Sequence, residues 1–277
     1  MIARGMVLLA SAAALGFCSG GAEAQPEPPR LAAHRAVYDL SLVSSRGIRA
    51  VEGAQGRIAY ELTGNACEGY AVKFRQVTVL DSPESGSRTS DLRTASFESG
   101  DGKSYRFRND SSGQGPSKTI DGSAERRPGS VLSIKLNTPR RQSVSLGDAV
   151  FPNAQMKDII AAAREGKTSL QMRVFDGSDD GRKVYETLAV IGREEKPGGE
   201  GLEAPARQDA LSKLSRWPVV LSYYASGRAD AAPVYVLSFD LFENGVSRAL
   251  KLDYGDFVLK GDLVSLDLYP EKGSCAR

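Results

Sequence analysis

The 277-residue chain has few of the residues on which catalytic and metal-binding sites most often depend. It contains one histidine, three cysteines and one tryptophan. The single histidine, His34, excludes a metal site built from several histidines, and it leaves a Ser-His-Asp triad dependent on a residue beside Arg35. The sequence also lacks a G-x-S-x-G nucleophile motif and a phosphate-binding P-loop. We therefore interpret His34 as a hydrogen-bonding residue at the start of a strand, and we expect no catalytic residues, metal or cofactor.

The sequence also lacks a strong charge imbalance and, after its first thirty residues, a long apolar run. The formal net charge is +2, and no block of lysine and arginine is long enough to indicate nucleic-acid binding. No apolar stretch in the rest of the chain reaches the length that a transmembrane helix requires. We expect a monomer that neither crosses a membrane nor binds nucleic acid.

The N-terminus has the pattern of an export signal. A positive charge is followed by an apolar run at residues 6–17 and by small residues at a cleavage site near Ala24. The predicted signal peptide covers residues 1–24, and the mature protein, residues 25–277, is expected in the periplasm. Cys18 leaves with the signal peptide, because the bulky residue before it is unsuited to lipoprotein processing.

Removal of the signal peptide leaves two cysteines, Cys67 and Cys275, in an oxidising compartment. Two cysteines in such a compartment are more often paired than free, so the sequence predicts a disulfide between them. The bond would close a loop of about 208 residues, for which chain entropy gives an upper value of about 5 kcal/mol. The wide separation differs from the C-x-x-C spacing of redox enzymes and favours a structural role.

Alternation of apolar and polar residues dominates the mature sequence. In residues 36–42, for example, Tyr38, Leu40 and Leu42 fall on one face of an extended chain. Similar runs recur about a dozen times, separated by turns rich in Gly, Asn and Asp. The pattern predicts a mainly β protein in which residues 25–277 form a single domain, since all-β domains often reach this size.

One predicted strand contains an odd offset in its apolar pattern. Tyr70, Val72 and Phe74 share one face, but the next apolar residues, Val77 and Val79, are out of phase with them. A bulge or a sharp bend would bring both sets onto the same face. We therefore expect an irregularity in this strand.

Residues 152–166 break the strand pattern. Pro152 suits the first turn of a helix, and Gly166 suits its C-terminal end. Four apolar residues recur between them at helical spacing: Met156, Ile159, Ile160 and Ala163. The segment predicts one amphipathic helix that plugs or covers the concave face of the sheet. Residues 195–210 are polar and rich in Gly and Pro, and we expect them to form a solvated loop or flap.

Two acidic groups match functional sites only in part. Residues 176–181, DGSDDG, resemble the opening of a calcium-binding loop, but the twelfth position is Thr187 instead of glutamate, which favours a hairpin loop. Asp253 and Asp256 could form the carboxylate pair of a glycosidase. Acidic residues on the polar face of a strand, with a glycine bend between them, are the simpler interpretation.

An aromatic group leaves a further choice open. Trp217, Tyr223 and Tyr224 could line an apolar cavity together with Met156 and Ile160 of the predicted helix. They could equally pack as ordinary core. An apolar cavity that the helix face leaves unfilled would favour the first interpretation.

Several longer strings resemble a known family. They include "AHRAVYDLSL", "CEGYAVKFRQV", "SDLRTASFESGDGKSYRF", "VFDGSDDGRKVYETLAVIG" and "SFDLFENGVSRALKLDYGDFVLKGDLVSLDLY". Over nearly the whole mature chain they are similar to the envelope integrity protein B (EipB) family of alphaproteobacteria. The resemblance implies a periplasmic β-spiral, an incomplete barrel wrapped around a helix. It also implies a disulfide from the cysteine of C-E-G-Y, Cys67, to Cys275 near the C-terminus.

The resemblance implies a role in maintaining the cell envelope, with no established enzymatic activity, and an architecture similar to that of periplasmic lipid and lipoprotein carriers. One departure is that "FPNAQM" has no histidine soon after "FP", where family members often carry one. Three hypotheses follow: a non-enzymatic protein that supports envelope integrity, a carrier that holds a lipid or lipoprotein in the concave sheet, and a cell-wall glycan hydrolase. The expected partners are other envelope proteins, lipids or lipoproteins.

Overall fold

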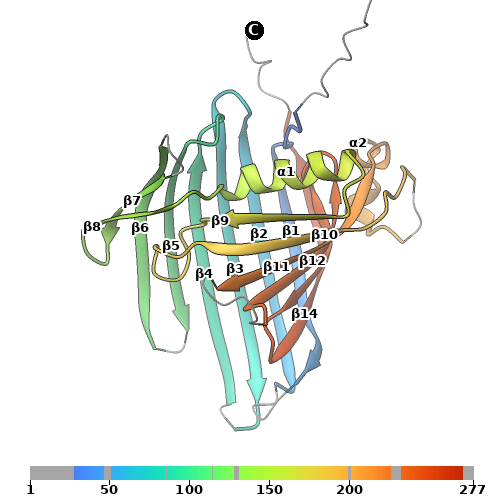
Figure 1. The fold of residues 1–277 in the computed structure, drawn as a ribbon. Helices are drawn as coiled ribbons and strands as arrows, with labels where there is room; N and C mark the ends of the chain where they lie inside the picture. The colour runs from blue at the N-terminus through green and yellow to red at the C-terminus, as the bar shows by residue number, and fades with distance from the viewer. Residues whose placement is uncertain are drawn as a thin grey trace, which may run out of the picture.

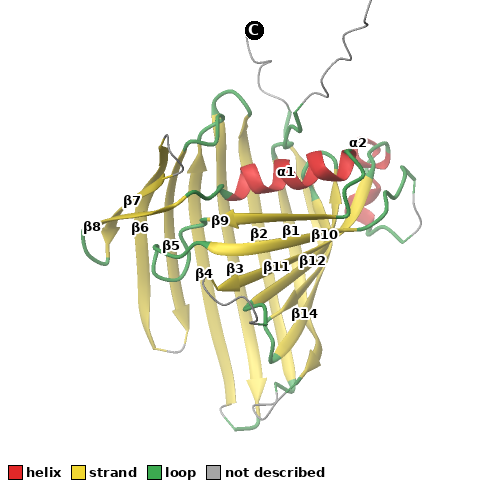
Figure 2. Ribbon diagram, in the orientation of Figure 1, coloured by secondary structure: helices red, strands yellow, loops and turns green. Residues whose placement is uncertain are grey.

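The computed structural model describes residues 28–46, 51–84, 86–113, 115–127, 131–198, 201–225 and 232–270. Within them the chain forms fourteen strands in one antiparallel sheet, two α-helices and one 3₁₀-helix (Figure 1, Figure 2). The strands are β1 (His34–Ser45), β2 (Gly53–Asn65), β3 (Gly69–Ser82), β4 (Gly86–Glu98), β5 (Ser104–Gly113), β6 (Gly115–Arg127), β7 (Val131–Thr138), β8 (Gln142–Gly147), β9 (Ser169–Val174), β10 (Tyr185–Ile191), β11 (Arg216–Ala225), β12 (Tyr235–Phe242), β13 (Ser247–Asp253) and β14 (Phe257–Leu268). The helices are α1 (Pro152–Arg164), η1 (Ala204–Arg207) and α2 (Asp209–Ser212). The predicted signal peptide and Cys275 lie outside the described residues.

The sheet is one open spiral in which the first and last strands lie at the middle. The strand order is β8-β7-β6-β5-β4-β3-β2-β1-β14-β13-β12-β11-β10-β9. β1 pairs with β14 from His34 opposite Leu268 to Ser45 opposite Phe257. On either side of this junction, strands that are consecutive in the sequence pair antiparallel with each other. Short connections between neighbours are therefore enough to form most of the sheet. The mainly β fold and the incomplete barrel are therefore confirmed, with fourteen strands where about twelve were expected.

The two edge strands, β8 and β9, approach each other at a short seam. Val150 forms a parallel bridge with Val174: its N–H donates to the Arg173 carbonyl at 2.8 Å, and its carbonyl accepts the Phe175 N–H at 3.0 Å. The Arg173 guanidinium also donates to the Asp148 carbonyl at 2.9 Å. These contacts hold the edges together without a continuous ladder, so the sheet curls but stays open.

The irregularity expected in β3 is absent, and that prediction was wrong. β3 pairs with both β2 and β4 in unbroken register along its length. Polar Gln76 and Thr78 continue the inner face, which leaves Val77 and Val79 on the outer face. Thr78 is 3% exposed, and the Gln76 amide donates to the Tyr254 hydroxyl at 3.0 Å. Hydrogen bonds inside the sheet accommodate these polar side chains, so the strand keeps a regular register without a bulge. The apolar pattern gives no sign of such bonds.

α1 lies across the concave face of the sheet, as predicted for the amphipathic helix (Figure 1). Pro152 is its first residue, and the helix ends before Gly166, whose φ is 73°. The N–H of Gly166 donates to the Ala163 carbonyl at 3.0 Å, and that of Lys167 donates to the Ala162 carbonyl at 2.9 Å. Among the described residues, no helix has both the length and the apolar character needed to cross a membrane.

In the described part of residues 195–210, which leaves out residues 199 and 200, the solvated loop was the wrong alternative, because this segment packs against the sheet. β13 pairs with β14 only between Leu250 and Asp253, so the rest of β14 needs another neighbour. η1 supplies it, and the Gln208 amide donates to the Leu266 carbonyl of β14 at 2.8 Å. Leu202 and Ala206 of this region, and Leu211 of α2 just after it, are buried in the cluster that contains β14. A few apolar residues among many polar ones gave too weak a pattern to predict this packing.

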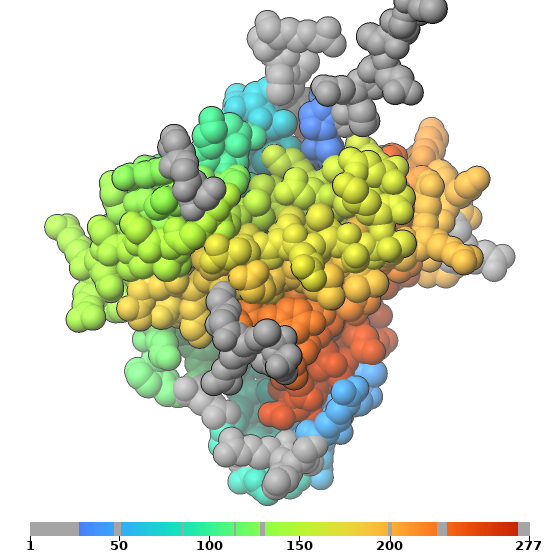
Figure 3. Space-filling view, in the orientation of Figure 1, coloured from blue at the N-terminus to red at the C-terminus, as the bar shows by residue number. Residues whose placement is uncertain are grey.

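Buried apolar side chains form three clusters around the curled sheet. The first joins α1 to both walls of the spiral, the second lies between β14, η1 and α2, and the third joins β5–β7 to the segments that flank α1. In the space-filling view, the segment from α1 to β10 covers much of the upper part of the face turned to the viewer (Figure 3). The first cluster therefore fills the inner face where α1 crosses it.

Candidate functional site: the inner face of the sheet

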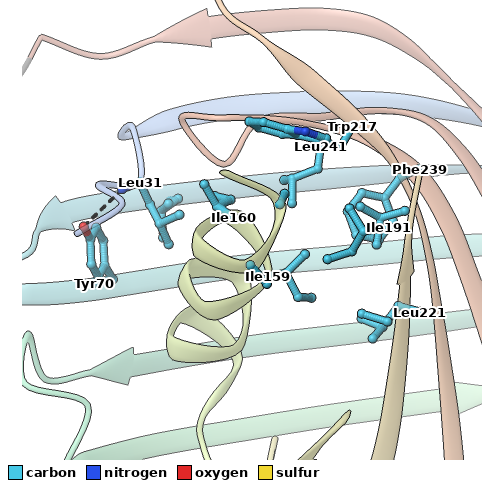
Figure 4. Close-up of a cluster of buried hydrophobic side chains, with 14 residues drawn as sticks. Leu31, Tyr70, Ile159, Ile160, Ile191, Trp217, Leu221, Phe239 and Leu241 are labelled. Atoms are coloured by element: carbon cyan, nitrogen blue, oxygen red, sulfur yellow. Dashed lines mark hydrogen bonds between the residues drawn. The ribbon is translucent and has the colours of Figure 1, made fainter. Parts of the chain in front are cut away.

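One end of the inner face is filled by apolar packing. Ile159 and Ile160 of α1 are both 0% exposed. They lie among side chains from β10, β11 and β12 (Figure 4): Ile191, Trp217, Leu221, Phe239 and Leu241. Burial of each isoleucine contributes about 1.5–3 kcal/mol. α1 is therefore part of the core, and it occupies this end of the interior.

The five residues considered as cavity lining occupy different environments. Trp217 and Ile160 are 4% and 0% exposed within the α1 cluster. Met156 and Tyr223 are partly buried at the border of the same cluster. Tyr224 lies on the outer face, because it alternates with Tyr223 along β11. Adjacency in the sequence had grouped two tyrosines that the strand places on opposite faces.

A row of aromatic rings, which sequence reasoning missed, follows the inner face from β10 to β14. Successive ring centroids are 6.0, 6.0, 5.1 and 5.0 Å apart. Tyr185 is 9% exposed, and the four rings after it are partly buried. We call these five residues the aromatic row: Tyr185, Tyr223, Tyr235, Tyr254 and Phe257. Its members come from separate strands and turns, so only the register of the sheet could reveal it.

The aromatic row reaches the opposite wall of the sheet at Gln76 of β3. Burial raises the pKa of Tyr223, Tyr235 and Tyr254 above the usual tyrosine range, so these hydroxyls stay protonated at neutral pH. Gln76 of β3 bonds the Tyr254 hydroxyl, and its neighbour in register, Leu92 of β4, is 39% exposed. The arrangement offers partly open apolar surface with a few hydrogen-bonding tips, which suits an elongated apolar ligand.

A buried carboxylate holds the start of α1. Glu98, the last residue of β4, is 1% exposed. Its Oε2 accepts the Asn153 N–H and its Oε1 accepts the Ala154 N–H, each at 2.8 Å. The helix has no side-chain cap of its own at Phe151, so Glu98 supplies the acceptors that its first N–H groups lack. The positive end of the helix dipole also favours a carboxylate at this position.

The environment of Glu98 changes its acidity. Burial raises the pKa of Glu98 from 4.5 to about 6, because removal of the carboxylate from water outweighs the hydrogen bonds from Asn153 and Ala154 and the charge of Lys157. No local sequence pattern indicates this role of Glu98. The acceptor and the helix start are 55 residues apart in the chain.

The turn that carries Cys67 packs against the end of β4. A Cβ atom at Gly100 would meet a carbonyl oxygen of this turn at 2.1 Å, and one at Gly69 would meet the Glu98 carbonyl oxygen at 2.5 Å. Only glycine permits such close approaches. Cys67 is exposed and takes part in a disulfide. Its predicted partner, Cys275, lies outside the described residues, so that pairing stays a prediction.

His34 is a buried residue whose ring makes a local hydrogen bond. It is 1% exposed, and its Nδ1 donates to the Ala32 carbonyl at 2.7 Å. Its ring lies 5.4 Å from that of Tyr60. Burial lowers the pKa of His34, which favours the neutral imidazole. These contacts agree with its interpretation as a hydrogen-bonding residue at the start of a strand.

Both acidic groups of the sequence lie in hairpin turns. Residues 176–181 join β9 to β10, as predicted, and the Asn109 amide donates to a carbonyl of this loop at 2.8 Å. Asp253 ends β13, and Asp256 follows Gly255, whose φ is 86°. In the part of the chain that the structure describes, no group of three or more His, Cys, Asp or Glu side chains is placed to hold a metal ion.

Comparisons with known proteins find similarity along most of the chain. A family model described as EipB-like matches residues 25–270. The cell envelope integrity protein EipB of Brucella abortus (strain 2308) is 35% identical over 251 residues, which cover 90% of this chain and 88% of that protein. A crystal structure of a beta-barrel-like protein of domain of unknown function DUF1849 from Brucella abortus has a TM-score of 0.80 and 34% identity, and covers 87% of this chain and 100% of that chain. The similarity is therefore that of a whole fold and is not confined to one motif.

Proposed function

The chain belongs to the EipB-like family, as its sequence strings predicted, and we propose on that premise that it supports the integrity of the cell envelope without acting as an enzyme. The observation that carries the proposal is the similarity, over 90% of the chain, to a relative named for that role. We place the protein in the periplasm, because the predicted signal peptide would export it. The inner face, with its buried helix and aromatic row, suits packing and binding.

The proposed role requires a sheet that stays folded and does not pair with other chains. Exposed edges such as β8 and β9 are sites at which strands of other proteins can add. The seam at Val150 and the packing of α1 oppose such opening. We propose that a Cys67–Cys275 disulfide adds to them by tying the β2–β3 turn to the chain after β14. The chain-entropy contribution would be up to about 5 kcal/mol.

A genetic experiment tests the envelope role. The gene is deleted in its own host, and sensitivity to detergent and to cell-wall antibiotics is measured. We expect the deletion strain to be more sensitive and the full chain to restore resistance. A chain that lacks residues 1–24 is the matched control, because it should stay in the cytoplasm and restore nothing. Normal resistance after deletion, or full rescue by the control, would contradict the proposal.

A second candidate function, a carrier of a lipid or of the acyl chain of a lipoprotein, is favoured by the aromatic row. Four of its rings are partly exposed on the inner face of the sheet, and Leu92, on the inner face of β4, is 39% exposed. Apolar surface left open inside a curled sheet is the usual property of sheets that bind acyl chains.

Two neighbouring tyrosines provide a matched test of the carrier function. Tyr223→Ser changes the inner face of β11, whereas Tyr224→Ser changes its outer face. We expect a fluorescent fatty acid to bind wild type and Tyr224→Ser alike, and Tyr223→Ser several-fold more weakly. Native mass spectrometry of protein isolated from its own envelope should also show a lipid adduct. Equal binding by the two variants, or no adduct and no probe binding, would exclude this function.

A further inference from the structure

The outer face of the sheet carries a basic hollow that the inner-face functions do not use. It spans β1 to β5 and has a volume of about 350 Å³. Five cationic side chains line it: Arg35, Lys73, Arg75, Arg93 and Arg108. Only two carboxylates do so, those of Glu61 and Asp110, and a third, Asp91, lies next to it. The hollow therefore carries a local excess of positive charge on a chain whose net charge is only +2.

The register of the strands produces the hollow. Ala95 of β4 is directly opposite Lys73 of β3 on one side and Arg108 of β5 on the other. Ala59 of β2 is directly opposite Arg75 in the same way. Small side chains at these positions leave space between long cationic ones on the same face. A carboxylate at position 95 would have paired with both neighbours, but the sequence has alanine there.

Two arginines face each other across the hollow. Arg75 and Arg93 are directly opposite in the β3–β4 ladder, an arrangement that destabilises a sheet when both residues carry the same charge. Asp91 offsets part of the repulsion, because its carboxylate accepts hydrogen bonds at 2.9 Å from Arg75 Nη2 and 2.8 Å from Arg93 Nη2. One carboxylate thus serves two guanidinium groups.

The guanidinium groups of Arg75, Arg93 and Arg108 each have a hydrogen-bond donor that the described residues do not use. Arg75 and Arg93 use Nε and Nη2 toward Asp91, and Arg108 uses the same two atoms toward Asp110. Within the described residues, Nη1 of each of these arginines makes no hydrogen bond. The three side chains are 53%, 58% and 54% exposed, so a ligand from solution can reach them.

We infer that this hollow binds a phosphate group, either free in solution or carried by the headgroup of an anionic lipid. A phosphate has several oxygens to accept N–H groups from more than one guanidinium, and its charge compensates for the repulsion between Arg75 and Arg93. The space above Ala95 places it between Lys73 and Arg108. This function is additional to the proposed envelope role, and it uses the opposite face of the sheet from the carrier function.

Two variants of the mature protein test the site, and one variant controls for net charge. Arg75→Gln/Arg93→Gln removes the facing guanidinium groups. Ala95→Glu fills the space and places a carboxylate where the ligand would bind. Arg140→Gln/Arg141→Gln removes two charges from exposed positions in the β7–β8 connection. Thermal unfolding of each variant comes first, and we expect Ala95→Glu to be at least as stable as wild type because it adds opposite-charge cross-strand pairs.

The probes are inorganic phosphate, followed by calorimetry, and vesicles of phosphatidylcholine with or without phosphatidylglycerol, followed by sedimentation. All measurements use low salt, since screening weakens exposed ion pairs. We expect both site variants to bind at least about tenfold more weakly than wild type. The charge control should stay within about twofold of wild type, a change much smaller than one tenfold step. Binding of phosphate alone would identify free phosphate as the ligand, and binding of anionic vesicles would identify the headgroup. Binding of neither probe, or equal weakening by the charge control, would overturn the inference.

Discussion

Replacing Glu98 by glutamine tests whether the carboxylate that holds α1 titrates in the folded protein. Its pKa rises from 4.5 to about 6 on burial, so folding favours the protonated form. A carboxyl group of this kind stabilises the fold fully below its unfolded pKa, and the contribution is lost as the pH rises through the folded value. Wild type should therefore lose stability through this group as the pH rises from 4.5 to about 6.

The magnitude follows from the two pKa values. The difference between 4.5 and about 6 corresponds to roughly 2 kcal/mol. Glu98 is 1% exposed, so screening by water reduces this value little. Glutamine offers one oxygen to two N–H groups, and an unsatisfied buried N–H costs about 1–3 kcal/mol. That cost does not vary with pH. The difference in stability between wild type and Glu98→Gln should therefore change by roughly 2 kcal/mol in the variant's favour between pH 4.5 and pH 7.

Urea unfolding at pH 4.5, 5.5 and 7 measures this difference. Fluorescence of Trp217, the only tryptophan, reports directly on the cluster that contains α1. Glu52→Gln, at an exposed residue, is the matched control and should follow the wild-type pH dependence. If wild type and Glu98→Gln give parallel stability curves over this range, Glu98 does not titrate as its burial requires, and the reasoning is refuted.

Two further predictions concern packing. Ile160→Ala should cost about 2–5 kcal/mol, because it removes a fully buried side chain from the α1 cluster, whereas Val190→Ala, at a residue that is 47% exposed, should cost less than about 0.5 kcal/mol in the same urea assay. Gly245 and Gly255 both have a φ of 86°, but a Cβ at Gly245 would meet Leu31 Cδ2 at 2.6 Å and one at Gly255 would meet nothing within 4 Å. Gly245→Ala should therefore lower the unfolding temperature more than Gly255→Ala, and equal decreases would show that backbone strain alone determines both effects.

The elements that rest on local pattern could be predicted from the sequence. Alternation at Tyr38 and Leu40 identified β1, and Pro152 and Gly166 marked the two ends of α1. These signals are short-range, since extended and helical backbones impose their own period on the apolar residues. The same property explains the error in β3. Alternation places Gln76 on the inner face, where its amide is satisfied by a hydrogen bond to a residue 178 positions away, which no local pattern contains.

The sites depend on register and could not be predicted in the same way. The aromatic row draws Tyr185, Tyr235 and Tyr254 from different strands and turns, and the basic hollow depends on which residue faces Ala95 on each side. A shift of one residue in any pairing would move these side chains to the other face. Sequence alone gives the face of each residue within a strand, but the partner across the ladder follows from the whole sheet.

The Cys67 disulfide and the Glu98 contact with α1 should be energetically coupled, because the Cys67 turn touches the end of β4. The close approaches at Gly69 and Gly100 allow little independent movement of this turn. Release of the turn would shift the end of β4 and misalign the carboxylate with the first N–H groups of α1.

A double-mutant cycle measures this coupling. Residues in contact commonly show interaction energies of about 0.5–3 kcal/mol. Once Cys67→Ser has released the turn, Glu98→Gln should cost less than it does in wild type, so the double variant should lose less stability than the sum of the single variants. Cys67→Ser combined with Glu52→Gln is the control and should be additive, because Glu52 lies apart from the turn in the β1–β2 connection. Additivity of both pairs to within about 0.5 kcal/mol would mean that the disulfide stabilises the chain without acting on the start of α1.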